Sequence, residues 1–238
     1  MEVKGHIIEP RANLHRVNFN GADLRGVNLT GANLSQANLR ANLTGAILTG
    51  ANLWGANLEG AALNGADLRG VNLQYSKLCH TYLIGANLTA ADLTGADMYA
   101  AHLNGAILTG AKLTGAKLTC AHLVDADLRR AKLAESENSS LRSADLTGAN
   151  LKGANLIGEN LALANLALAI LTGADLGGAD LFQANMYRAD LGGANLSQAK
   201  MYRADLREAN LRNADLADAD LTDADLTGAT MPDGTIHE

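Results

Sequence analysis

Two histidines, His102 and His122, are the residues whose type and spacing first suggest chemistry. They lie 20 positions apart, and Tyr82 precedes them by a further 20 positions. Two imidazoles could share a metal ion, but a structural zinc site takes four ligands. Cys79 and Cys120 do not obviously converge with the histidines, so we expect a solvent-exposed ladder of side chains. The sequence predicts no metal and no cofactor.

Motifs of catalysis are missing from the chain. The sequence contains no GxSxG, no HExxH, no phosphate-binding loop and no CxxC pair. Two isolated cysteines give no disulfide framework. We therefore expect a protein that is not an enzyme and that resides in a reducing, cytoplasmic compartment.

A period of five residues positions every one of these side chains. Leucines, with few exceptions, fall at every fifth position from 14 to 39, from 43 to 133 and from 141 to 231. A small residue, usually Ala, stands two positions before each leucine, and Asn or Asp often stands one before. Residues two apart point to the same side of a strand. Each unit therefore reads as a very short strand with Ala and Leu inward, followed by a corner rich in turn-forming residues.

No unit can bury its two apolar residues alone, so the units must coil and stack on one another. Segments such as GADLRGVNLTGANLSQANL (21–39) and GADLGGADLFQANMYRADLGGANL (173–196) resemble the pentapeptide-repeat family, whose motif is A(D/N)Lxx. The resemblance covers residues 12–231. It implies an all-β, right-handed quadrilateral parallel β-helix with four repeats per coil, about 11 coils and a length of about 50 Å.

The expected organisation has three parts. Residues 1–11 form an N-terminal cap, residues 12–231 form a single β-helix, and residues 232–238 form a capping tail. At the two ends, Ile7, Ile8 and Ile236 are candidates to fold over the open coils. Glu159 occupies an inward position, where a buried carboxylate is costly unless it is neutral or the backbone turns it outward.

Apolar residues at outward positions in the C-terminal half form a candidate interaction surface. If residues 20 apart stack, Phe182 lies directly beside Tyr202. The complete set comprises Leu163, Leu168, Ile170, Phe182, Tyr187 and Tyr202. Aromatic residues are only 3% of the chain, so their gathering outside the core suggests a protein partner. The alternative is packing between coils that only stiffens the rod.

The repeat is interrupted once, near 134–140. Leu133 and Leu141 are eight residues apart, which is one unit plus three. The candidate loop consists of Glu135, Ser136, Glu137, Asn138, Ser139 and Ser140. Its polar composition favours a surface bulge, with docking of a partner as the second interpretation. Leu39 and Leu43 show the opposite irregularity, because they are four residues apart and the repeat there is one residue short.

The charge distribution separates two functions. Residues 1–133 carry 12 Lys and Arg against 9 Asp and Glu, whereas residues 134–238 carry 7 against 16. This balance argues against direct binding of nucleic acid, and no apolar run is long enough to cross a membrane.

The family resemblance implies a rigid scaffold for protein–protein interaction. The tail GATMPDGTIHE and the single interruption resemble a regulatory, cyanobacterial member of the family. The alternative is a DNA-mimicking protein that interacts with DNA gyrase, for which the acidic end is favourable and the basic half is not.

Overall fold

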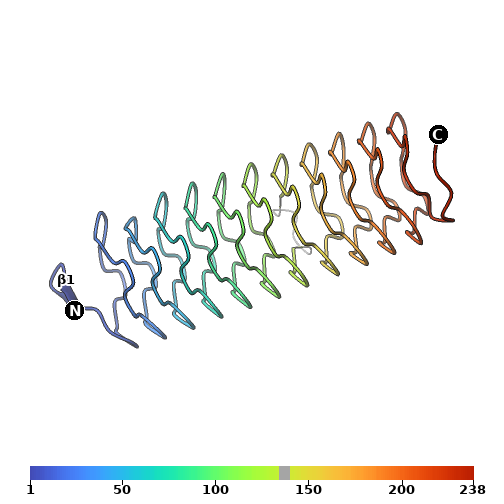
Figure 1. Ribbon diagram of the computed structural model, residues 1–238. Coiled ribbons are helices and arrows are strands. Elements are labelled where there is room, and N and C mark those ends of the chain that lie inside the picture. Colours follow the sequence, from blue (N-terminus) through green and yellow to red (C-terminus); the bar gives the residue numbers. More distant parts are fainter. Residues whose placement is uncertain (134–139) are drawn as a thin grey trace.

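The computed structural model is a straight rod built from one repeated coil (Figure 1). The structure describes residues 1–133 and 140–238. Isolated parallel bridges join residues 20 apart, as in Lys77↔Asp97 and Asp180↔Lys200. With a five-residue unit, this register means that four units complete one coil. The two ends of the chain lie at opposite ends of the rod.

Short backbone hydrogen bonds run between coils along the whole rod. The amide of Leu63 donates to the carbonyl of Tyr82 at 2.7 Å, and the amide of Tyr82 donates to Ala61 at 2.9 Å. Apart from the short step after Leu39, the described corners are β-turns, such as the one in which the amide of Ala86 donates to Leu83 at 3.0 Å. The last central residue of each turn has a positive φ, for example 65° at Gly85, which explains why glycine is frequent there.

The preference for Asn or Asp before each leucine has a local cause. The side-chain oxygen of Asn42 accepts a hydrogen bond from the amide of Thr44 at 3.1 Å and from its hydroxyl at 2.7 Å. This contact fixes the entry to the corner, as short polar side chains do in Asx-turns. The same bond recurs down the rod at many Asn and Asp positions, for example Asn87 and Asp180.

The core is a narrow column of leucine and alanine. Leu103 and Leu176 are fully buried, as are nearly all their counterparts in the repeat. Within residues 1–133 and 140–238, three positions that normally hold alanine hold polar residues. Thr81 and Ser76 are buried but donate to the carbonyls of Leu58 and Leu73, at 2.8 and 2.7 Å. Glu159 is 3% exposed, so its side chain stays inside and the backbone does not turn it outward.

The two irregular steps leave the stacking intact. From Asp23↔Asn42 to Asn38↔Asn57 the bridges join residues 19 apart, which accommodates the missing residue. Across the second interruption, Lys117↔Ser140 and Lys132↔Asn155 join residues 23 apart, and the 20-residue register then resumes. The three extra residues therefore shift the numbering without changing the order of the faces.

The ends of the rod differ from each other. Strands β1 (Glu2–Val3) and β2 (His6–Ile7) pair antiparallel before the first coil. Ile8 joins the core at 5% exposure, but Ile7 and Ile236 are 63% and 62% exposed, so the expectation that these two cover the coils is wrong. At the C-terminal end the backbone makes the closing contact instead, through the antiparallel bridge Thr230↔Ile236.

Candidate functional site

We call six outward apolar residues of the C-terminal half the apolar patch; the three aliphatic ones are exposed and the three aromatic ones are half-buried: Leu163, Leu168, Ile170, Phe182, Tyr187 and Tyr202. The rings of Phe182 and Tyr202 are stacked, with centroids 5.8 Å apart and planes 16° apart. The amide of Leu163 donates to the carbonyl of Phe182 at 2.8 Å, which brings this leucine beside the stacked rings. The 20-residue register thus assembles one surface from separate repeats.

The leucines of the apolar patch are exposed on strained corners. Leu163 is 41% exposed at φ 62°, and Leu168 is 54% exposed at φ 61°. A residue with a Cβ pays about 1–2 kcal/mol for this left-handed conformation. Among the described residues these are the only leucines with positive φ; glycine, alanine and polar residues predominate at such corners. Because both leucine side chains face solvent, burial of apolar surface does not offset this strain.

Charged residues form an ordered rim around the aromatic part of the apolar patch. Arg188 lies 5.0 Å from the ring centre of Tyr187 and pairs with Glu208 at 2.7 Å. Arg203 lies 4.9 Å from the ring centre of Tyr202. The Arg188 guanidinium lowers the pKa of Glu208, chiefly through this hydrogen bond. An apolar centre with a polar rim is the usual anatomy of a protein–protein interface.

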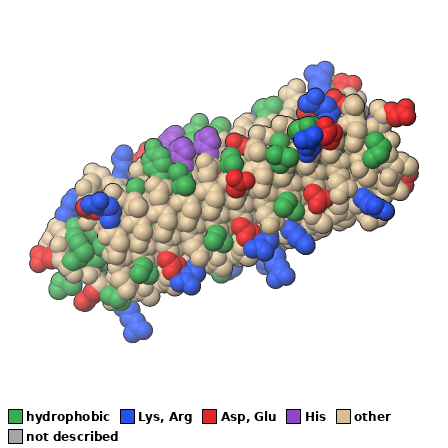
Figure 2. Space-filling view, viewed as in Figure 1, with side chains coloured by type: hydrophobic (Ala, Val, Ile, Leu, Met, Phe, Trp, Pro, Cys, Tyr) green, Lys and Arg blue, Asp and Glu red, His purple; other side chains and the backbone are tan. Residues whose placement is uncertain are grey.

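A second aromatic row lies in the N-terminal half of the rod. The ring of Tyr82 stacks on His102, with centroids 4.8 Å apart, and His102 stacks on His122 at 4.9 Å. Tyr99 meets His80 edge to face at 5.6 Å. Figure 2 shows histidines side by side with hydrophobic side chains next to them. The described residues contain no group of three or more His, Cys, Asp or Glu that could hold a metal ion.

The environment of His102 favours the neutral form of its imidazole. Burial lowers the pKa of His102, and the nearby His122 and His80 lower it further. Burial likewise raises the pKa of the Cys79 thiol to about 11, so this thiol is not activated as a nucleophile. The described histidines and cysteines therefore give no catalytic arrangement.

Only Ser140 of the candidate loop belongs to the described residues. Glu135, Ser136, Glu137, Asn138 and Ser139 lie outside the described residues, so their interpretation stays a prediction. Ser140 takes part in the stack, bridged to Lys117, and its hydroxyl accepts a hydrogen bond from the amide of Arg142 at 3.2 Å. Its role is thus that of an ordinary corner-forming residue, equivalent to Asn or Asp elsewhere.

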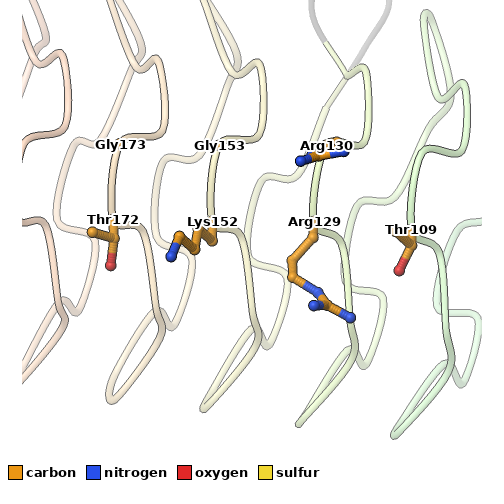
Figure 3. A pocket seen from close by; sticks show the side chains of 7 residues that line it. All are labelled: Thr109, Arg129, Arg130, Lys152, Gly153, Thr172 and Gly173. Atoms are coloured by element: carbon orange, nitrogen blue, oxygen red, sulfur yellow. The ribbon is translucent and has the colours of Figure 1, made fainter.

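A hollow on the side of the rod was not anticipated from the sequence. It is open, measures about 690 Å³, and is lined by Thr109, Arg129, Arg130, Lys152, Gly153, Thr172 and Gly173. Figure 3 shows these residues on successive coils of the rod. The signal for it in the sequence was the spacing of Arg129 and Lys152, which are 23 residues apart. The 23-residue step across the second interruption places these two residues on adjacent coils, one above the other.

The fold and its surface define a class: a solenoid of five-residue repeats that presents its functional groups on outer faces. The model of the family described as pentapeptide repeats matches in eight copies over residues 11–40, 39–74, 72–110, 96–134, 134–161, 160–198 and 199–233. The chain belongs to the pentapeptide-repeat family, for which a right-handed quadrilateral β-helix is implied.

Three solved structures are similar to the chain. HetL, a pentapeptide repeat protein involved in heterocyst differentiation regulation from the cyanobacterium Nostoc sp. strain PCC 7120, is 37% identical, with 96% of this chain and 94% of that chain covered and a TM-score of 0.31. Rfr23 from the cyanobacterium Cyanothece 51142 is 26% identical, with 48% and 86% covered and a TM-score of 0.39. QnrB1, a plasmid-mediated fluoroquinolone resistance protein, is 20% identical, with 83% and 88% covered and a TM-score of 0.43.

Comparison with curated proteins gives no match. Within the described ranges, no helix is long and apolar enough to span a bilayer.

Proposed function

We propose that the chain is a rigid, non-enzymatic scaffold that binds another protein through the apolar patch. The observation that carries this proposal is the placement of Leu163 and Leu168, two exposed leucines on left-handed corners. A side chain that costs stability and buries little surface is retained most readily where it serves an interaction. The stacked rings of Phe182 and Tyr202 supply a rigid neighbouring surface.

The narrower form of the proposal is a regulatory role in a cyanobacterium, exerted in the cytoplasm through protein contacts. HetL, to which the chain is 37% identical in sequence, is described as involved in the regulation of heterocyst differentiation. The supporting features of this chain are its apolar patch and the absence of activated nucleophiles among its described residues. The scaffold itself would comprise a cap at 1–11, about 11 right-handed coils over 12–231 and a capping tail at 232–238.

The experiment is a quantitative affinity capture from a cyanobacterial lysate with three forms of the protein. Leu163→Gly/Leu168→Gly removes the exposed leucines and relieves the corner strain. The matched control, Ala90→Gly/Ala100→Gly, relieves the same strain (φ 56° and 51°) at corners outside the apolar patch. We expect at least one protein to be retained by the wild type and the control and lost from the patch variant. If every captured protein is retained equally by all three forms, the proposal is wrong.

A second candidate function is a DNA mimic that interacts with DNA gyrase. The observation in its favour is the acidic end of the rod, where Asp205 bridges to Asp225 and Asp215, Asp218 and Asp223 are exposed. The positive charge of residues 1–133 is unfavourable for a mimic of DNA. A supercoiling assay separates the two: inhibition of gyrase at equimolar protein or below would favour the mimic, and unchanged supercoiling would eliminate it.

A further inference from the structure

The open hollow at mid-length gathers cations on a rod that is acidic as a whole. The chain has a net charge of −6, yet three of the seven residues that line the hollow are Arg129, Arg130 and Lys152. In Figure 3 the side chains of Arg129 and Lys152 extend from adjacent coils, and Thr109 and Thr172 continue the same row on either side. We call this site the basic hollow.

The register places these residues at fixed spacings. Bridges Ile107↔Asp127 and Asp127↔Asn150 put Thr109, Arg129 and Lys152 one above another on three consecutive coils. Adjacent coils are about 4.8 Å apart, so these side chains follow one another along the rod. The guanidinium of Arg129 donates to Asp127 at 2.6 Å and the hydroxyl of Thr172 donates to Asp190 at 3.1 Å, which leaves the ammonium of Lys152 as the cation of this row without an ion pair among the described residues. A second column runs alongside, in which Lys112 is bridged directly to Lys132.

Few acidic groups compensate for this charge. Asp127 pairs with Arg129 at 2.6 Å and Asp92 pairs with Lys112 at 3.5 Å. Among the described residues Arg130, Lys132 and Lys152 have no ion pair. Like charges directly opposite each other destabilise a sheet, so the cluster lowers the stability of the free protein. An anion bound between the cations would remove that repulsion.

The backbone leaves room for such an anion. At Gly153 and Gly173 an added Cβ would meet no atom within 4 Å, as at most glycine corners of the rod, so these two corners are open to solvent beside the cationic side chains. Guanidinium and ammonium groups, such as those of Arg130 and Lys152 in the lining of this hollow, are the usual partners of phosphate oxygens.

The charge pattern also limits the size of the anion. The column that holds Lys112 and Lys132 carries Asp92 on one side and, beyond Asn155, Asp175 on the other. A long polyanion laid along the rod would meet these carboxylates, whereas a compact one would not. The site therefore fits a single phosphate-bearing group better than nucleic acid, whose charges continue over many contacts.

We propose that the basic hollow binds a compact oxyanion of the phosphate class, held by Arg130 and Lys152 with Arg129 beside them. The group could belong to a free small molecule or to a phosphorylated side chain of another protein, because the two present the same oxygens. This site is independent of the apolar patch and does not rest on the scaffold proposal.

The test is isothermal titration with inorganic pyrophosphate at constant ionic strength, with chloride as the background anion. Arg130→Gln/Lys152→Gln is compared with Lys77→Gln/Lys200→Gln, which removes the same charge from exposed positions outside the hollow. We expect the control to bind like the wild type and the hollow variant to bind at least about tenfold more weakly, since one hydrogen bond to a charged group is worth about that factor. Equal affinity of both variants, or no binding by the wild type, would overturn the proposal.

Two additional measurements make the result specific. Circular dichroism and the midpoint of thermal unfolding establish that the hollow variant folds; without anion its midpoint should equal or exceed that of the wild type, because repulsion is removed. Titrations with a phosphoserine peptide, with its unphosphorylated form and with a short DNA duplex identify the source of the phosphate. Preference for DNA over both pyrophosphate and phosphopeptide, lost in the hollow variant, would contradict a compact ligand.

Discussion

The imidazole rings of His102 and His122 lie face to face, with centroids 4.9 Å apart and planes 5° apart. Protonating both would place two positive charges in contact, which explains why His122 contributes to lowering the pKa of His102 after burial. The fold therefore favours the neutral form of His102 more than the unfolded chain does.

This relationship predicts how stability depends on pH. The unfolded chain binds a proton at His102 more readily than the folded protein does. The contribution of His102 to the unfolding free energy is therefore fully present above the pKa of the unfolded state, and it is lost as the pH falls toward the pKa of the folded state. We expect the thermal midpoint to fall from about pH 7 to about pH 5, and His102→Gln to remove part of that fall. His237→Gln, in the exposed tail, is the control and should keep the wild-type slope. Identical slopes for both variants would contradict the prediction.

The sequence D-L-R forms a local ion pair wherever it occurs in the repeat. Arg69 donates to both carboxylate oxygens of Asp67, at 2.8 and 2.6 Å, and Arg25 does the same to Asp23. The hydrogen bond from Arg69 is the main cause that lowers the pKa of Asp67 to about 2. Since the folded pKa is depressed, its stabilisation is present above the unfolded value of about 4 and is lost as the pH falls toward 2.

We accordingly expect Arg69→Gln to raise the pKa of Asp67 and to move the midpoint of acid unfolding to a higher pH. Titration of the Asp67 carboxyl carbon by NMR measures the first effect directly. Arg16→Gln, which leaves Asp67 unchanged, is the control. An Asp67 pKa that stays near 2 without Arg69 would show that the backbone contacts alone hold it.

The loss of unfolding free energy on truncating a core leucine should depend on the position of that leucine along the rod. Leu103 is fully buried, so Leu103→Ala should cost about 2–5 kcal/mol of unfolding free energy through lost burial and the cavity left behind. Leu226, in the last coil, is only partly buried, and Leu226→Ala should cost clearly less. Urea unfolding followed by circular dichroism compares the two, and equal losses would contradict a core that opens toward the C-terminal end.

The second interruption can be removed by design. Deleting Glu137–Ser139 shortens the step from Leu133 to Leu141 to five residues, so that bridges such as Lys117↔Ser140 would return to the 20-residue register. We expect the deletion variant to fold with the same circular dichroism spectrum and to unfold at least as cooperatively. If it folds but no longer captures the proteins retained by the wild type, the segment is a docking site. If capture survives, the segment is a tolerated insertion.

Much of the architecture was predictable because every unit makes the same contacts. The five-residue period assigned Ala and Leu to the interior, and the family resemblance supplied the 20-residue register that the bridges confirm. The same register placed Phe182 on Tyr202. Whether the apolar patch binds a partner stays a prediction.

The amino-acid sequence by itself determined which positions face inward, because a short repeat leaves a single way to bury its two apolar residues. Only the tertiary structure decided what meets on the outer faces. It buried Glu159, left Ile7 and Ile236 in solvent, and joined Arg130 and Lys152 in one hollow. The physical reason is that outward contacts arise between coils, so they depend on the step across each irregularity and on the direction of each long side chain.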